Sequence, residues 1–212
     1  MEKRHTTPAE FYLQSVELGI EVLTSGYLPS FIVPLWKGGA VPGQGVISLC
    51  EKLGIDDFYK ANGKRFNHFP LRAKRYNKDG TEMPNLEITG LDAIHLMPYD
   101  KVLIVDEVWD KGRTPVGVRR ALRRNYFLQN PVDATLAKHG LPYQAPTIKI
   151  AVITYKLDKT KVPETPDFCL ELTNPSPWIT YPGEDDGIVF TELEARIESI
   201  RGKVEEAMRR SV

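Results

Sequence analysis

The stretch from Val102 to Thr114, Val-Leu-Ile-Val-Asp-Glu-Val-Trp-Asp-Lys-Gly-Arg-Thr, decides the fold. It begins with four apolar, mostly β-branched residues, which are typical of a strand buried on both faces inside a parallel sheet. Asp106 and Glu107 follow directly, and a third acid comes within one further turn of chain. Thr114 followed by Pro115 matches a helix start, with a hydroxyl N-cap and proline at the first helical position. The pattern predicts a buried strand, an acidic loop and a helix.

The loop between this strand and this helix suits a phosphorylated sugar. Lys111, Gly112 and Arg113 place a glycine and two cations beside the N–H groups of a helix N-terminus, which forms an anion site suited to phosphate. The nearby carboxylates would repel a bare phosphate, so the ligand must also bring hydroxyl donors or a cation. A sugar diol at Asp106 and Glu107, with its 5′-phosphate in the loop, meets both needs. The carboxyl ends of parallel strands are also where open α/β sheets bind ligands.

The run resembles the phosphoribosyl diphosphate signature of the type I phosphoribosyltransferases. That signature is an apolar strand, two acids, two apolar residues, an acid, a variable residue, glycine, a variable residue and threonine, and residues 102–114 match it in order. The alternative is an ordinary buried strand and acidic turn. The resemblance implies an α/β fold with a doubly wound, mostly parallel sheet and a small C-terminal hood.

Composition bounds the function. A chain of 212 residues suits one α/β domain with a subdomain. Lys+Arg and Asp+Glu both number 28, so no net charge attracts nucleic acid or an anionic membrane. Cys50 and Cys169 lie far apart without a metal-ligand spacing, which favours a reduced, cytoplasmic setting. No apolar run has the length of a signal peptide or a membrane span, so we expect a soluble cytoplasmic protein.

The other elements continue the α/β pattern. Thr7-Pro8-Ala9-Glu10 is a capping box that opens a helix to about Thr24, and a helix from Ala40 to Leu53 is expected to be interrupted or delayed by Pro42 and Gly43. The remaining expectations are strands at 31–36, 148–155 and 168–172, a hairpin from 69 to 90 with a mobile loop near 77–92, and helices at 114–125, 132–139 and 191–210. They divide the chain into a core over 1–155, a hood over 156–190 and a C-terminal helix over 191–212. The 126–146 connection is longer than in compact family members, and Arg119, Arg120, Arg123 and Arg124 predict a solvated or subunit-facing helix surface.

A second loop between a strand and a helix contains Lys37, Gly38 and Gly39. A basic residue with two glycines at that point makes a second anion site, although a plain turn explains the loop equally well when it is taken alone. In the purine phosphoribosyltransferases a similar short loop holds the pyrophosphate. The resemblance implies that role for these three residues.

A third group resembles the base-recognition hood of the 6-oxopurine enzymes. By position, the resemblance implies that Lys156 donates to the 6-oxygen, that Trp178 stacks on the purine, and that the backbone near Ile179 reads the 2-position. An ammonium prefers an oxo acceptor, and an indole offers a large stacking face. Taken singly, core packing of Trp178 and a surface position for Lys156 are the simpler interpretations. Bacterial xanthine-guanine enzymes often have Pro-Trp-Asp or Pro-Trp-Glu where residues 182–184 read Pro-Gly-Glu, so hypoxanthine, guanine and xanthine all stay open.

The resemblance therefore implies a Mg²⁺-dependent, oligomeric purine phosphoribosyltransferase, a homodimer or homotetramer, that uses phosphoribosyl diphosphate. Asp106 and Glu107 would hold the ribose hydroxyls directly or through Mg²⁺, and Asp110 would act as general base near the purine N7. The 5′-phosphate would lie against Lys111, Gly112, Arg113 and Thr114. The alternatives are a regulator that senses phosphoribosyl diphosphate on the same fold and a transferase for another nucleobase. Neutral charge and the absence of a helix-turn-helix pattern count against the regulator.

Overall fold

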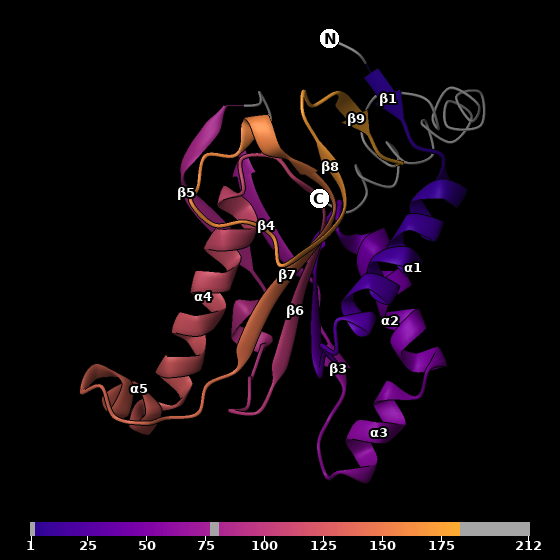
Figure 1. Cartoon of the computed structure of the whole chain (residues 1–212). Helices are drawn as coiled ribbons and strands as arrows, with labels where there is room; N and C mark the ends of the chain where they lie inside the picture. Colours follow the sequence, from indigo (N-terminus) through magenta and orange to yellow (C-terminus); the bar gives the residue numbers. More distant parts are fainter. Residues whose placement is uncertain (1–2, 77–80, 183–212) are drawn as a thin grey trace, which may run out of the picture.

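The structure, a computed structural model, describes residues 3–76 and 81–182. Its centre is a seven-stranded sheet in the order β5-β4-β2-β6-β7-β8, with the short strand β3 beside β2 (Figure 1). All pairs are parallel except β4 with β5, which confirms the mostly parallel sheet. The strands are β2 (Phe31–Trp36), β3 (Asn67–His68), β4 (Leu71–Tyr76), β5 (Glu82–Thr89), β6 (Lys101–Trp109), β7 (Thr147–Lys156) and β8 (Phe168–Thr173).

Helices cover both faces of this sheet (Figure 1). Along β6, Val102 and Ile104 pack in a core cluster with residues of α4, whereas Leu103 and Val105 pack with residues of α1 and α2. A strand buried on both faces needs apolar residues at consecutive positions, which explains the unbroken apolar run in the sequence. The helices are α1 (Pro8–Thr24), α2 (Ala40–Lys52), α3 (Ile55–Ala61), α4 (Arg113–Gln129) and α5 (Pro131–Lys138), with one-turn 3₁₀ segments η1 (Leu91–Ala93) and η2 (Leu157–Lys159).

Two helix starts compare differently with the sequence. The capping box of α1 is confirmed, since the Thr7 N–H donates to Glu10 Oε2 at 2.9 Å and the Glu10 N–H donates to Thr7 Oγ1 at 3.3 Å. The expected interruption of α2 is wrong, because this helix runs unbroken from its first residue. Pro42 lies in the first turn, where a missing N–H leaves no intrahelical bond unmade.

The start of α4 also differs from the prediction. Thr114 is not the N-cap, because the helix begins one residue earlier and Gly112 takes the cap position with φ +75°. Glycine adopts this left-handed conformation without steric cost, so the turn closes at Gly112. Pro115 still lies in the first turn, where it is tolerated. The helix also continues past the expected end at Asn125 to Gln129.

A two-stranded sheet that the sequence did not predict joins the hood to the first residues of the described chain. β1 (Lys3–His5) pairs in parallel with β9 (Trp178–Thr180), with Arg4 opposite Ile179, and the Arg4 guanidinium is paired with the Glu171 carboxylate of β8. The two ends of the described chain therefore meet above the sheet (Figure 1). Of the loop expected near 77–92, residues 77–80 lie outside the described residues, whereas β5 and η1 take up most of the remainder. The end of the hood beyond 182 and the helix at 191–210 also lie outside the described residues.

The antiparallel hairpin of β4 and β5 is confirmed.

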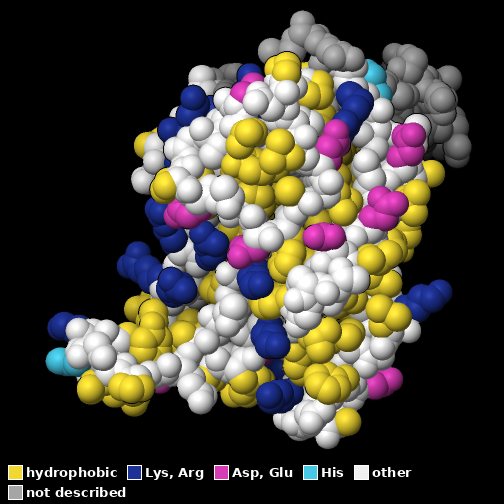
Figure 2. Space-filling model, viewed as in Figure 1, with side chains coloured by type: hydrophobic (Ala, Val, Ile, Leu, Met, Phe, Trp, Pro, Cys, Tyr) yellow, Lys and Arg dark blue, Asp and Glu magenta, His cyan; other side chains and the backbone are white. Residues whose placement is uncertain are grey.

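None of the helices in the described ranges is long and apolar enough to cross a membrane. Side chains of Lys and Arg gather over α4 (Figure 2). On this helix Arg120 pairs with Glu164 at 2.8 Å and Arg119 with Asp167 at 3.7 Å. These arginines therefore engage the connection between β7 and β8.

Candidate active site

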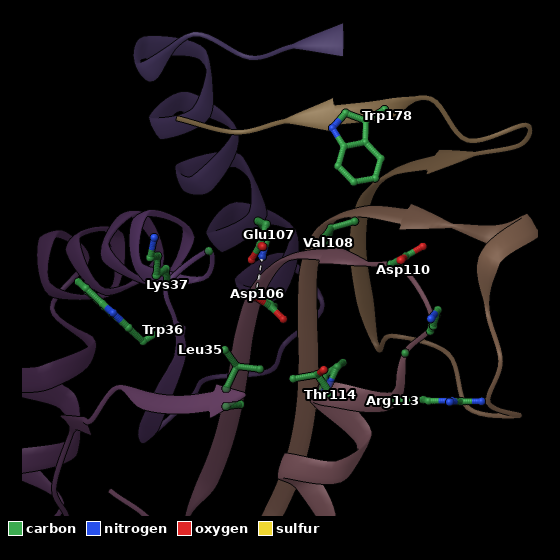
Figure 3. Close-up of a pocket in the computed structure, with 15 residues that line it drawn as sticks. Leu35, Trp36, Lys37, Asp106, Glu107, Val108, Asp110, Arg113, Thr114 and Trp178 are labelled. Atoms are coloured by element: carbon green, nitrogen blue, oxygen red, sulfur yellow. Dashed lines mark hydrogen bonds between the residues drawn. The ribbon is translucent and has the colours of Figure 1, made fainter. Parts of the chain in front are cut away.

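One pocket lies at the carboxyl ends of β2 and β6, below β9 (Figure 3). It has a volume of about 440 Å³. Its walls come from two strand-to-helix loops, from β4 and from the hood, so segments far apart in sequence meet there. The lining residues are Leu35, Trp36, Lys37, Gly38, Ala73, Asp106, Glu107, Val108, Asp110, Lys111, Gly112, Arg113, Thr114, Pro115 and Trp178.

Asp106 and Glu107 lie within β6, which continues past them to Trp109 by pairing with β7. The Glu107 N–H donates to Asp106 Oδ1 at 3.1 Å (Figure 3). Glu107 Oε2 is buried and has no hydrogen-bond partner among the described residues. Two adjacent carboxylates, one with an unsatisfied buried oxygen, form a site that is short of donors or of positive charge.

Burial and the neighbouring carboxylate act together on Asp106. Loss of hydration, followed by repulsion from Glu107, raises the pKa of Asp106 well above its ordinary value. A cation or a hydroxyl donor bound here would stabilise the ionised form, because it supplies what the site lacks. The arrangement therefore suits a metal ion, a diol or both.

The Lys37 loop closes the pocket from the β2 side. Gly38 lies against the Glu107 carboxylate, and a Cβ at this position would come within 1.9 Å of Glu107 Oε1. Gly39 lies behind the pocket wall, where its N–H donates to Leu35 O at 2.8 Å and a Cβ would meet Val105 O at 2.3 Å. The structure therefore brings Lys37 and Gly38 to the pocket, whereas Gly39 allows the turn to pack against β6.

Sequence analysis gave no role to Trp36. This indole is 56% exposed, lines the pocket beside Lys37, and precedes a cis peptide bond. The apolar pattern predicts the strand to Trp36, but it does not show that the last side chain of the strand is exposed while the other five are buried.

The loop after β6 rests on a buried tryptophan. The Trp109 side chain is fully buried and packs edge-to-face against Tyr155, with ring centroids 6.2 Å apart. Gly112 lies directly on this indole, since a Cβ would come within 2.5 Å of Trp109 Cε2. Both the positive φ and this contact therefore require glycine. Sequence analysis missed Trp109, which fixes the position of the loop from Asp110 to Thr114.

The hood brings one of the three predicted base-binding residues to the pocket. Trp178 is 56% exposed and lies over the pocket on β9 (Figure 3). Lys156 is the last residue of β7 and is nearly buried, and its Nζ lies 5.7 Å from the centroid of the Trp178 ring. Ile179 is buried in the core cluster that contains Phe11. Neither Lys156 nor Ile179 is among the described residues that line the pocket.

Comparisons with known proteins agree with this geometry at the level of the fold. No protein-family model matches the sequence, and no curated protein matches it. A purine phosphoribosyltransferase from Pyrococcus horikoshii is 21% identical, with 87% of this chain and 96% of that chain covered and a TM-score of 0.56. The Helicobacter pylori xanthine-guanine-hypoxanthine phosphoribosyltransferase is 18% identical, with 92% and 99% covered and a TM-score of 0.57.

A third similar structure contains a ligand. It is a hypothetical protein from Neisseria gonorrhoeae with bound ppGpp, 18% identical, with 94% of this chain and 98% of that chain covered and a TM-score of 0.52. The fold implied by residues 102–114 is therefore confirmed by structures that share little sequence with this chain. A mostly parallel sheet with helices on both faces, together with these likenesses, shows that the chain has the fold of the type I phosphoribosyltransferases, as found in purine phosphoribosyltransferases.

Proposed function

We propose that the chain is a Mg²⁺-dependent purine phosphoribosyltransferase. It would transfer 5-phosphoribose from phosphoribosyl diphosphate to a 6-oxopurine, giving a nucleoside monophosphate and pyrophosphate. One observation carries the proposal: a single pocket joins the acids of β6, the two glycine-containing loops and an exposed tryptophan. These are complementary to a diol, two phosphate groups and a flat base, and the known purine enzymes with this fold support the choice.

The phosphate groups would lie at the two loops. Arg113 and Thr114 are the first residues of α4, so their N–H groups have no intrahelical acceptor and can donate to the 5′-phosphate, as can that of Gly112. On the opposite wall, the exposed Lys37 and the backbone of Gly38 would hold the leaving pyrophosphate. Because Gly39 has its N–H bonded to Leu35 O, its part in this loop is steric.

Asp106 and Glu107 would hold the ribose hydroxyls and a Mg²⁺ ion. The donor set fits this ion, since Mg²⁺ takes one or two protein carboxylates and completes its shell with water and substrate oxygens. Glu107 Oε2 is a buried oxygen without a hydrogen-bond partner among the described residues, and a metal ion would supply one. No group of three or more potential metal ligands occurs within the described ranges, so the protein itself would offer the ion these two carboxylates. When bound, Mg²⁺ would neutralise charge on the pyrophosphate leaving group. Asp106 and Glu107 would hold the ion in place.

Asp110 would act on the base. Cleavage at the anomeric carbon builds oxocarbenium character, which is stabilised by placed charge and exclusion of water more than by covalent work. Asp110 is half-buried in the pocket wall and would accept the proton that the purine loses, near N7. Trp178 would stack on the base from the hood, with the Lys156 ammonium behind it. We propose that Lys156 reaches the 6-oxygen only by leaving the face of this indole.

A second candidate is a nucleotide sensor without catalysis. The N. gonorrhoeae protein with bound ppGpp shows that a chain with this fold holds a phosphorylated guanine nucleotide. The same loops and the same tryptophan would hold such a ligand here, in place of or in competition with phosphoribosyl diphosphate. A cytoplasmic setting, which the free thiols of Cys50 and Cys169 suit, fits either candidate.

A panel assay separates the two candidates. Purified protein is incubated with phosphoribosyl diphosphate, MgCl₂ and one base at a time (hypoxanthine, guanine, xanthine, adenine, orotate or uracil), and pyrophosphate release is measured. We expect release with at least one 6-oxopurine and none with adenine. Release only with adenine or a pyrimidine would refute the base assignment. No release with any base, together with tight binding of phosphoribosyl diphosphate or ppGpp in calorimetry, would establish the sensor.

A further inference from the structure

One carboxylate on the hairpin engages three cations at the edge of the pocket. Glu82 begins β5, and its Oε1 lies 2.7 Å from Arg113 Nη1 and 3.3 Å from Arg75 Nε. Its Oε2 lies 3.5 Å from Lys111 Nζ. Arg75 belongs to the neighbouring strand β4, whereas Lys111 lies in the loop after β6 and Arg113 is the first residue of α4. The hairpin and this loop are therefore joined through a single carboxylate.

The position of Glu82 relative to the pocket matters. Lys111 and Arg113 line the pocket, whereas Glu82 is not among its described lining residues. Arg113 extends away from Asp106 in Figure 3. Glu82 therefore holds the charged ends of Lys111 and Arg113 toward the hairpin, and that of Arg113 lies on the side away from Asp106.

Glu82 is ionised at neutral pH. The Arg113 guanidinium, aided by Arg75 and Lys111, lowers the pKa of Glu82 below its ordinary value. Its side chain is 26% exposed, so a ligand and solvent can reach the ion pairs. Partly exposed ion pairs of this kind are weak and exchange readily with a competing anion.

We propose that Glu82 is an internal anion that competes with the ligand's phosphate for Lys111 and Arg113, and that Arg75 completes this cationic group. The inference rests on the proposed function, which places a 5′-phosphate at residues 111–114. A phosphate monoester displaces the carboxylate because it carries more charge and offers three acceptor oxygens to the same guanidinium and ammonium groups. Arg75 then retains Glu82 on the hairpin while the two loop cations turn to the ligand. Glu82 thus sets how tightly the loop binds phosphate.

Binding of ribose 5-phosphate tests this inference without requiring catalysis. Its dissociation constant is measured by calorimetry for the wild-type protein, Glu82→Gln and the matched control Glu87→Gln, which removes an exposed carboxylate from the same strand. Removing two ion pairs of the exposed kind from competition should make Glu82→Gln bind about three- to tenfold more tightly. Glu87→Gln should bind like the wild type. If Glu82→Gln is poorly folded in a thermal melt, Glu82→Asp, whose shorter side chain weakens the same ion pairs, should show a smaller gain in the same direction.

The outcomes separate this inference from the proposed function. Equal or weaker binding by Glu82→Gln would overturn the inference, since Glu82 would then position the cations for the ligand, and the proposed function would stand. An equal gain in Glu87→Gln would also overturn it, because net charge alone would explain the change. If no protein binds ribose 5-phosphate, the inference falls, and the pyrophosphate-release assay decides whether the proposed function falls with it.

Discussion

The two ends of β6 hold carboxylates in opposite environments. Asp100, just before the strand, is 1% exposed and fully partnered. Ser30 Oγ donates to its Oδ1 at 2.9 Å, the Met97 N–H donates to its Oδ2 at 2.7 Å, and Arg65 Nη2 lies 3.3 Å from the same oxygen. At the other end, Asp106 has a second carboxylate as its neighbour and accepts from the Glu107 N–H.

The carboxylates at the two ends of β6 therefore differ in whether the fold itself compensates their charge. A buried carboxylate that has donors and a cation is part of the fold, because its charge is already compensated. A pair of adjacent carboxylates without a cation costs stability when both are ionised, and either protonation or a bound cation or hydroxyl donor relieves that cost. The amino end of β6 therefore anchors the sheet, whereas the carboxyl end carries carboxylates whose charge the described residues leave uncompensated.

The largest expected effect is at the carboxyl end. Asp110→Asn removes the proposed proton acceptor and should lower turnover by about 10²- to 10⁴-fold, the range for loss of a general base. Binding of phosphoribosyl diphosphate should stay within about twofold of the wild type, because the proposed contacts of Asp110 are with the base. Steady-state pyrophosphate release and calorimetry measure the two quantities.

A suitable control is Asp92→Asn, which changes an exposed acid in η1 outside the pocket. It should leave both quantities unchanged. Unchanged turnover in Asp110→Asn would remove the base assignment, and a parallel loss of phosphoribosyl diphosphate binding would place Asp110 in the sugar site instead.

At the amino end, Asp100→Asn should affect stability and spare catalysis. The substitution removes the charge that compensates the Arg65 guanidinium and presents an amide donor to the donors of Ser30 and Met97, so we expect a loss of about 2–4 kcal/mol in the free energy of unfolding. Urea denaturation measures the loss, with the exposed Asp57→Asn as control. Turnover per folded molecule should match that of the wild type. A stable but inactive Asp100→Asn protein would contradict the division between the two ends.

The parts of the fold that the sequence predicts are those set by local pattern. Residues 102–105 are apolar at consecutive positions because both faces of β6 are covered, and this alone indicates a doubly wound sheet. β1 shows no such pattern, since Lys-Arg-His is polar and becomes a strand only through its pairing with β9 and the contact between Arg4 and Glu171. Pairing of this kind depends on tertiary structure and leaves no local signal.

The candidate site divides in the same way. The convergence of the acidic loop and the Lys37 loop follows from the rule that parallel strands present their carboxyl ends at one edge. Side-chain directions do not follow from it. The pairing of Lys111 and Arg113 with Glu82 and the position of Gly39 behind the wall depend on packing between segments distant in sequence. The capping of α4 by Gly112 depends on the buried position of the Trp109 ring beneath it. Sequence patterns predict which residues form such a site, whereas tertiary packing determines the orientation of their charged side chains.

The smallest expected effect concerns the stability that the protein loses by holding an ionised Asp106 in the folded state. Burial and Glu107 raise the pKa of Asp106 in the folded protein, so folding favours the protonated acid. The contribution of the protonated acid to stability is therefore fully present below the pKa of the unfolded chain. It is lost as the pH rises through the pKa of the folded protein. An asparagine at this position does not titrate, so at pH 8 the Asp106→Asn protein should be more stable than the wild type by roughly 0.5–2 kcal/mol, the usual range for a single stabilising substitution. The gap should close as the pH falls toward about 4, near the ordinary pKa of aspartate.

Thermal melts across this pH range measure the gap, and the same melts with MgCl₂ and phosphoribosyl diphosphate test its meaning. A ligand that binds only the folded state raises its stability, and the ion should need the carboxylate that the variant lacks, so the wild type should gain more than Asp106→Asn. The order of stability should then reverse at pH 8 when ligand is added. Two outcomes would contradict this prediction: an Asp106→Asn protein less stable than the wild type at pH 8 without ligand, or a gap that widens on acidification. Either would mean that the charge of Asp106 is compensated within the fold, as that of Asp100 is, and that no ligand is needed to balance it.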